Sequence, residues 1–530
     1  MKKIFEKHGM LRSVGALMDI VAFLLFIVSI FVDASNADMI LKLIGIVLFV
    51  VGSMFVAVTC EKSRLAKSLF VFIVTSILLT WLFAYGYFQG SDFYEYGMSR
   101  IGFADFGYAL YYSVNFILDK IVFLLVLTGF YGVLSKISGY QKLTENIAKT
   151  FSKHKIVSSV VISVILFVLT SLFTQTFVVL LFIPFFISIL AKMDIDKVTT
   201  FAVTFGSALV GILGCTYGTD SLIAFNRYLG QEINVALTYR FIIAVVSLVL
   251  YEFFIVMRLR KTLNSTKKKE KNSNLVSDPF EVKNVKEAKT LPVAIVLGIV
   301  AIIIILGYID WSTNFNIDVF NTFHDWLINL EAGDEFTIFG YILGSKADAL
   351  GAFKFVFSIS AMLLVASALV AFLYKMKVDE YVDSFFEGNK KMLKPLLFVI
   401  ASYVIFGICY LTPVIPTIAN WFLNLVEGFN PYLTAIMAFI TSLFQNDLGY
   451  SAYTVGGFLT SAYADNINIV HTIFVSMYGL VQIFMPTSAL LVVGLSLMDV
   501  DYKDWLKYIW LFVVGLIVIL LVLFTVVTYI

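Results

Sequence analysis

The chain contains 530 residues, of which 60% are hydrophobic and 14% are charged, and its formal net charge is +2. Its mean hydropathy is +0.93. Soluble globular domains contain about 25% charged residues, so this composition excludes a soluble protein and indicates a protein that lies in a lipid bilayer.

Apolar segments follow one another along most of the chain. A membrane-spanning helix needs about 20 mostly apolar residues. Such segments lie at 14–32, 38–59, 67–88, 114–134, 156–173, 176–192, 199–224, 238–257, 291–309, 353–374, 395–412, 432–445, 448–463, 467–498 and 505–529. Several are too short to cross a bilayer. Short arms around a polar tip are typical of re-entrant hairpins, which we expect at 156–192 and 432–463.

One sequence unit occurs twice. The run TSLF occupies residues 170–173 and again 441–444, and Thr216 matches Thr487 at the same spacing of 271 residues. An interrupted apolar stretch follows the hairpin in each copy. This pattern predicts paired broken helices that face a common site near the bilayer midplane, as in secondary transporters. The predicted parts are extra N-terminal helices at 1–90, a first repeat at 91–257 with its broken helix at 199–224, a linker at 258–290, and a second repeat at 291–529 with its broken helix at 467–498.

Charged residues between the apolar segments predict the orientation of the chain. Lys and Arg accumulate on the cytoplasmic side, and the linker is strongly basic from Arg258 to Lys271. The segment 310–348 holds seven acidic residues and one lysine, so we expect it outside. The N-terminus is then cytoplasmic, the C-terminus is outside, and the repeats have inverted topology. We interpret the linker as a solvated tether and expect no nucleic-acid partner.

Two interruptions carry the first group of candidate site residues. Between Gly211 and Ser221, three glycines and several hydroxyls interrupt an apolar helix. An unwound helix would present backbone groups to a ligand, whereas the alternative is a glycine-lined packing face. At the matching place in the second repeat, Pro486 removes a backbone donor. The candidate binding residues here are Thr216, Tyr217, Gly218, Thr219, Asp220, Pro486, Thr487 and Ser488.

The hairpin tips carry the second group. Amides and hydroxyls at a tip can coordinate a dehydrated cation or hydrogen-bond a substrate, and the ends of both arms direct their partial charges there. The candidate residues are Thr174, Gln175, Thr176, Gln445, Asn446, Asp447, Gly449 and Ser451. Asp447 fits an N-cap of the second arm as well as a role in ion coupling. We expect Arg227 and Arg240 at the rim of the membrane.

Patterns of catalytic or metal-binding residues are missing from the sequence. Cys60, Cys215 and Cys409 are scattered in apolar context without the spacing of a metal site. Neither a metal-type HExxH run nor a GxSxG nucleophile elbow occurs. We therefore expect no enzyme activity, no bound metal and no cofactor, with Na+ or H+ as the coupling ion of a transporter.

Three segments carry a resemblance to a known family. They are GFYGVL at 129–134 leading to Gly139, FFEGNKKML at 385–393, and the ending PTS at 486–488 with Gly494-Leu495, Tyr502 and WLK at 505–507. These segments resemble the YfcC-type carriers, which belong with the anaerobic C4-dicarboxylate carriers and arginine/ornithine antiporters in the ion transporter superfamily. The resemblance extends over roughly residues 100–529.

The resemblance implies an inverted-repeat elevator carrier with a scaffold that dimerises and a transport domain of two re-entrant hairpins and two broken helices. Such carriers move amino acids, dicarboxylates or small peptides. The tips differ from the usual family pattern: GMxEE and SGSG type tips are replaced here by LFTQT at 172–176 and QNDLG at 445–449. The first interruption has CTYG at 215–218 in place of the usual Asn-Pro.

These features predict an all-α polytopic membrane protein of the inverted-repeat elevator type, present as a homodimer. A composition rich in Phe, Ile, Lys and Tyr is typical of AT-rich bacterial genomes, so we expect a bacterial plasma membrane. The expected function is secondary active transport of a small carboxylate-bearing metabolite (an amino acid, a dicarboxylate or a short peptide) by cation coupling or exchange. The alternative is a non-transporting receptor or scaffold derived from such a carrier, because altered tips are how coupling would be lost.

Overall fold

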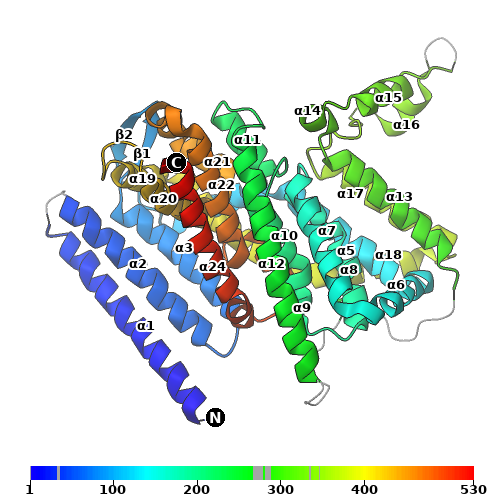
Figure 1. Ribbon diagram of the computed structural model, residues 1–530, viewed down its shortest axis with the longest axis horizontal. Coiled ribbons are helices and arrows are strands. Elements are labelled where there is room, and N and C mark those ends of the chain that lie inside the picture. The colour runs from blue at the N-terminus through cyan, green and yellow to red at the C-terminus, as the bar shows by residue number, and fades with distance from the viewer. Residues whose placement is uncertain are drawn as a thin grey trace. The chain divides into compact units, whose positions relative to one another are not determined.

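The computed structural model describes residues 2–32, 36–266, 278–280, 288–332, 336–344 and 346–529 (Figure 1). Its contacts divide the chain into two compact units, and each is described by itself. Unit 1 comprises Met1–Phe116, Ala224–Gln231 and Leu397–Ile530, and unit 2 comprises Ile117–Ile223 and Glu232–Leu396. The linker residues 267–277 and 281–287 lie outside the described residues, so the predicted tether is not described here.

Unit 1 combines the N-terminal helices with the C-terminal part of the chain. Its complete elements are α1 (Lys2–Ser29), α2 (Asn36–Thr59), α3 (Arg64–Leu82), β1 (Tyr85–Gln89), β2 (Asp92–Gly97), α4 (Phe103–Phe116), α19 (Ile415–Leu423), α20 (Pro431–Gln445), α21 (Leu448–Ala462), the 3-10 helix η4 (Ala464–Asn466), α22 (Ile467–Phe484), α23 (Ala489–Leu497) and α24 (Tyr502–Tyr529).

Unit 2 contains the middle of the chain. Its complete elements are α5 (Leu118–Lys136), α6 (Ser138–Phe151), the 3-10 helix η1 (Ser152–His154), α7 (Lys155–Leu172), the 3-10 helix η2 (Thr176–Leu181), α8 (Ile183–Lys192), α9 (Lys197–Phe201), the π-helical η3 (Ala202–Gly206), α10 (Ser207–Leu213), α12 (Leu237–Thr266), α13 (Leu291–Tyr308), α14 (Trp311–Phe315), α15 (Val319–Ile328), α16 (Ile338–Leu343) and α17 (Phe357–Leu373). Helices α11 (Asp220–Tyr228) and α18 (Val378–Leu411) contribute residues to both units.

The helices have the length and composition of a polytopic membrane protein. Within the described ranges, ten helical segments are long and apolar enough to cross a bilayer. Shorter apolar helices lie at Thr176–Lys192, Lys197–Leu213, Phe357–Leu373 and Pro431–Gln445. The prediction of an all-α polytopic membrane protein is confirmed, whereas inverted topology and elevator movement stay predictions.

A short β-hairpin in unit 1 was not expected from the sequence. The apolar segment 67–88 was expected to be helical throughout, but α3 ends at Leu82 and β1 pairs with β2 in antiparallel register. Both strands are rich in aromatic residues, which favour strands: Tyr85, Tyr87 and Phe88 in β1, and Phe93, Tyr94 and Tyr96 in β2. Gly90 adopts a φ of +62° in the two-residue turn, a conformation that glycine adopts without steric strain.

Helix α18 begins earlier than expected. Its apolar part was predicted from residue 395, but the helix already starts at Val378 and passes through Pro395. Charged residues end an apolar run without ending a helix, since Glu, Lys and Met are strong helix formers. Within unit 2, α18 packs closely on α5: a Cβ on Gly132 would overlap the Ser384 carbonyl oxygen, and one on Gly388 would overlap that of Thr128. These glycines belong to the two motif runs GFYGVL and FFEGNKKML, so close helix packing explains them.

Glycines also bring α1 and α2 together in unit 1. The two helices lie side by side (Figure 1), and a Cβ on Gly15 would be 2.5 Å from the carbonyl oxygen of Gly52. Asp19 of α1 accepts a hydrogen bond of 3.1 Å from Ser53 of α2. Because glycine has no side chain, the backbones of α1 and α2 can approach this closely at Gly15 and Gly52.

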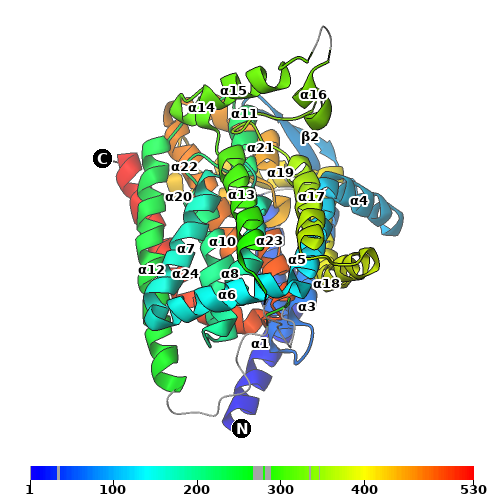
Figure 2. The same ribbon diagram turned by 90° about the vertical axis from the view of Figure 1, so that its right-hand side faces the viewer.

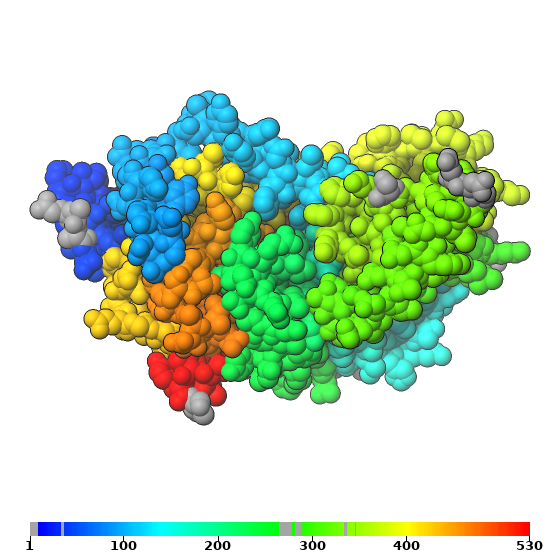
Figure 3. Space-filling view, turned by 90° about the horizontal axis from the view of Figure 1, so that it is seen from above, coloured from blue at the N-terminus to red at the C-terminus, as the bar shows by residue number. Residues whose placement is uncertain are grey.

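Unit 2 contains elements that lie outside the apolar spans. Helix α6 is amphipathic and runs across α8 and α13, which it contacts (Figure 2). The acidic segment 310–348 forms the short helices α14, α15 and α16, which appear as a yellow-green surface in Figure 3. These helices also expose large apolar side chains, among them Phe323, Trp326 and Ile342.

Candidate functional site

The predicted hairpin at 156–192 is a helical hairpin in unit 2. Helix α7 ends at Leu172, the chain turns in extended geometry, and η2 and α8 follow. Lys155 Nζ donates to the Met193 carbonyl oxygen at 2.5 Å, so the start of the first arm and the end of the second arm meet. We call residues 173–176 the first tip.

The first interruption is unwound. Helix α10 ends at Leu213 and α11 begins at Asp220, and we call residues 214–219 the first break. Ser171, the residue before last in α7, holds this segment. Its hydroxyl donates to the Gly214 carbonyl at 2.7 Å and accepts from Thr216 N at 3.1 Å. Of the two alternatives left open by the sequence, the break therefore has unwound rather than helical backbone geometry.

Gly218 lies against the first tip. Its N–H donates to the Ser171 carbonyl oxygen at 3.0 Å, and a Cβ at this position would overlap the carbonyl oxygen of Phe173. Nearby, Thr176 Oγ1 donates to Asp220 Oδ1 at 2.9 Å. The break is thus hydrogen-bonded to the end of α7, the tip is hydrogen-bonded to the start of α11, and Gly218 packs against the tip itself.

The other candidates of unit 2 differ in how much hydrogen-bonding capacity they retain. Thr174 N donates to the Tyr308 carbonyl at 2.8 Å, and its hydroxyl donates to the Phe353 carbonyl at 2.6 Å. Gln175 is buried, and its Oε1 has no hydrogen-bond partner among the described residues. Thr219 Oγ1 accepts from Leu222 N at 3.4 Å, at the start of α11.

The predicted hairpin at 432–463 lies in unit 1. Helix α20 ends at Gln445, and α21 begins at Leu448; we call residues 445–447 the second tip. Gln445 and Thr454 exchange two hydrogen bonds of 3.0 and 3.1 Å across the hairpin. Asn446 adopts left-handed geometry with a φ of 42°, which Asn tolerates better than most residues.

Asp447 caps the second arm. Its Oδ1 accepts from Tyr450 N at 2.7 Å, which is the N-cap geometry expected at a helix start. Its carbonyl oxygen accepts from Ser451 Oγ at 3.1 Å. A Cβ on Gly449 would overlap the side chain of Ala224, so this glycine allows close packing. A role of Asp447 in ion coupling stays a prediction.

The second interruption separates α22 from α23, and we call residues 485–488 the second break. Ser488 caps α23, because its Oγ accepts from Leu491 N at 3.3 Å. The last carbonyls of α22 accept hydrogen bonds from α24: Tyr502 donates to Phe484 at 2.8 Å and Trp505 to Ile483 at 3.0 Å. Tyr502 and Trp505, which belong to the C-terminal segment that carries the family resemblance, therefore satisfy carbonyls that the end of a helix leaves without a partner.

Several buried polar atoms near the tips and breaks have no hydrogen-bond partner among the described residues. They are Gln175 Oε1 in unit 2, and Asn446 Nδ2, Gln482 Nε2 and Thr487 Oγ1 in unit 1. All four side chains are at most 4% exposed. Because buried polar groups in proteins are nearly always hydrogen-bonded, these atoms are suited to a polar ligand.

Arg240 lies in the first turn of α12 and is 1% exposed, so its side chain does not snorkel into water, and its position at the membrane rim stays a prediction. Glu252 on the same helix is half-buried and accepts from Ser163 at 2.5 Å. The sequence signal for both was a lone charged residue inside an apolar run, which marks a functional candidate in a membrane helix. Sequence reasoning underestimated both residues.

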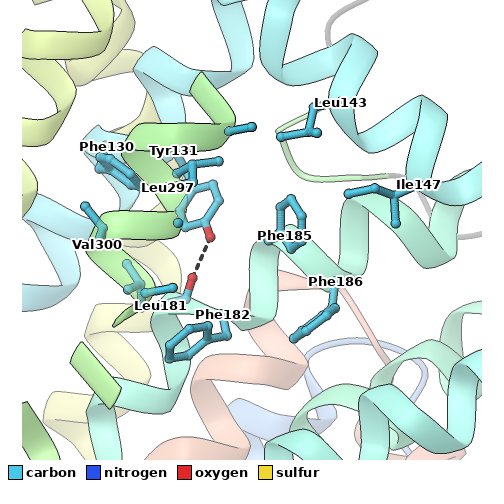
Figure 4. A pocket seen from close by; sticks show the side chains of 13 residues that line it. Phe130, Tyr131, Leu143, Ile147, Leu181, Phe182, Phe185, Phe186, Leu297 and Val300 are labelled. Atoms are coloured by element: carbon cyan, nitrogen blue, oxygen red, sulfur yellow. Dashed lines mark hydrogen bonds between the residues drawn. The ribbon is translucent and has the colours of Figure 1, made fainter. Parts of the chain in front are cut away.

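A pocket elsewhere in unit 2 has a different character. It has a volume of about 340 Å³ and lies between α5, α6, α8 and α13. Phe130, Phe182 and Phe185 are among the side chains that line it (Figure 4). Its one phenol, Tyr131, donates to the Leu181 carbonyl at 2.5 Å. Such a wall suits apolar atoms, and we do not assign a carboxylate-bearing solute to it.

In the part of the chain that the structure describes, no group of three or more His, Cys, Asp or Glu side chains could hold a metal ion.

Comparison with known proteins supports one family. The family model for DcuC, the C4-dicarboxylate anaerobic carrier, matches residues 39–529. The match confirms the resemblance carried by the three sequence segments. It starts closer to the N-terminus than the resemblance did, so it also includes α3 and most of α2. No curated protein matches the chain.

Proposed function

Because the chain belongs to the C4-dicarboxylate anaerobic carrier family, we propose that it moves a C4-dicarboxylate across the plasma membrane of a bacterium by secondary active transport. The match over residues 39–529 is the observation that carries this proposal. Amino acids and short peptides remain the broader substrate classes to be tested. Flux is coupled to Na+ or H+, or proceeds by exchange of one solute for another.

The two tips and two breaks supply the ligands in this proposal. Buried atoms without partners, such as Asn446 Nδ2 and Thr487 Oγ1, support it. A dicarboxylate presents oxygen acceptors to N–H and O–H donors, and the helix N-termini at the breaks favour negative charge. The candidate residues of the first tip and break contribute in the same way.

The transport mechanism we propose is an elevator movement in a homodimer, with inverted repeats and a cytoplasmic N-terminus. The resemblance of the motif runs to elevator carriers supports it. The altered tips favour a second candidate, a receptor or scaffold without flux, because the usual GMxEE and SGSG patterns are replaced.

Uptake of labelled succinate into proteoliposomes tests the proposal. The full chain is reconstituted, and uptake is measured with a Na+ gradient, with a proton gradient, and with succinate loaded inside. A carrier shows saturable uptake that one of these conditions accelerates. Uptake equal to that of empty liposomes in all three would instead support the receptor.

Variants of unit 1 test the ligands. Thr487→Val removes the hydroxyl and keeps the shape of the side chain. Asn446→Gly removes the amide, and glycine tolerates the left-handed backbone at this position. We expect each variant to fold and to lose uptake. Thr472→Val is the matched control, because this buried hydroxyl donates to the Asn468 carbonyl of its own helix at 2.7 Å. Unchanged kinetics in both site variants would contradict this assignment.

A further inference from the structure

Arg240 is a buried cation beside the first break. It is 1% exposed and lies in α12, whose neighbouring residues contact the break. The ring of Phe241 is 6.0 Å from that of Tyr217, and a Cβ on Gly214 would be 3.1 Å from the Cα of Ala244. The Arg240 charge interacts with Cys215 and Tyr217 of this unwound segment.

The hydrogen-bonding capacity of Arg240 is only partly used. Nη2 donates to the Ile233 carbonyl oxygen, whereas Nε and Nη1 have no partner among the described residues. The described ionisable groups that act on its charge are Cys215 and Tyr217. Neither of these groups is a carboxylate, the usual ion-pair partner of a guanidinium.

An unbalanced buried charge is unfavourable. Removing an ion from water costs several kcal/mol in real proteins, and an ion pair or further hydrogen bonds are needed to offset this. A ligand carboxylate would supply both, because it carries the opposite charge and accepts parallel N–H bonds from a guanidinium fork.

We propose that Arg240 binds one carboxylate of the transported solute and thereby selects anionic substrates. The inference rests on the proposed transport function and adds to it a residue outside the tips and breaks. Arg240 holds the carboxylate at the first break, where Tyr217 is only half-buried.

Succinate and its diamide, succinamide, distinguish this role, since they have the same carbon skeleton but only succinate carries carboxylates. Wild-type protein, Arg240→Gln and Arg240→Lys are reconstituted, and KM for succinate and inhibition by succinamide are measured. Loss of a buried charge partner predicts a rise in KM on the order of a hundredfold for Arg240→Gln, with loss of the preference for succinate. Arg240→Lys keeps the charge but loses the fork, which predicts a rise of about tenfold.

Arg260→Gln is the matched control, because this exposed arginine lies on the same helix. It should leave KM unchanged. A thermal-shift measurement on purified wild type and variants reports whether each protein is folded and whether it binds succinate. If Arg240→Gln does not fold, Arg240→Lys still tests the role through its KM.

The outcomes separate this inference from the proposed function. Wild-type uptake of succinate with unchanged KM in the folded Arg240 variants would overturn the inference and leave the function intact. Binding of succinate that depends on Arg240 but without uptake would support the anion site and overturn transport. If wild type neither binds nor transports succinate, both are overturned.

Discussion

At the scale of single residues, Gly218 shows how tightly the first tip and first break are joined. A methyl group there would meet the Phe173 carbonyl, which is backbone and cannot rotate away. We expect Gly218→Ala to destabilise the folded protein by about 1–3 kcal/mol, as overpacking does, and to reduce uptake of the solute. Thermal unfolding of the purified protein measures the first effect and proteoliposome uptake the second.

Gly298→Ala is the control for this prediction. Gly298 lies within α13, and a Cβ there would have no heavy atom within 4 Å. Ala favours a helix over Gly by about 0.5–1 kcal/mol, so this variant should be as stable as wild type or slightly more so. If both substitutions changed the free energy of unfolding equally, the contact between Gly218 and the first tip would not contribute to stability.

At the scale of elements, the second break depends on helix α24. The Tyr502 hydroxyl donates to the Phe484 carbonyl at the end of α22. Tyr502→Phe keeps the ring and removes this donor, which leaves the carbonyl without this partner in partly buried surroundings. We expect a loss of about 1–3 kcal/mol in unfolding free energy, seen as a lower midpoint of thermal unfolding.

A tyrosine at the end of the same helix provides the comparison. Tyr529 is 64% exposed, so Tyr529→Phe should leave the midpoint within the experimental error. If Tyr502→Phe unfolds at the wild-type midpoint as well, α24 does not stabilise the end of α22.

At the scale of the whole molecule, the distribution of charge predicts the sidedness of the chain. We expect Ser273, in the basic linker, to face the cytoplasm, and Thr322, in the acidic segment, to face outward. The measurement uses a variant without Cys60, Cys215 and Cys409 and with one new cysteine at either position. A membrane-impermeant maleimide should label Thr322→Cys in intact cells and Ser273→Cys only after permeabilisation.

Labelling of both positions from the same side would contradict the predicted topology. The experiment does not depend on transport, because it reports sidedness alone. Thr322 is exposed in α15, so a reagent in water can reach it.

The sequence alone determined the class of protein and the position of its irregular segments. Apolar runs, glycines and prolines act locally, so the hairpins around 173–176 and 445–447 and the breaks after Leu213 and Phe484 lie where the pattern predicted them. The N-cap role of Asp447 was also readable, because the cap and its helix are adjacent in the chain. The β-hairpin at Tyr85–Gly97 could have been predicted from its many aromatic residues on both sides of a Gly-Ser turn.

Only the tertiary structure decided which distant groups satisfy one another. Ser171 holds the first break, Tyr502 and Trp505 donate hydrogen bonds to the end of α22, and Arg240 is buried. None of these follows from local pattern, because hydrogen bonding and burial depend on residues brought together from separate helices. In a mostly apolar chain many positions look alike, and a buried guanidinium is recognised only when its neighbours are known.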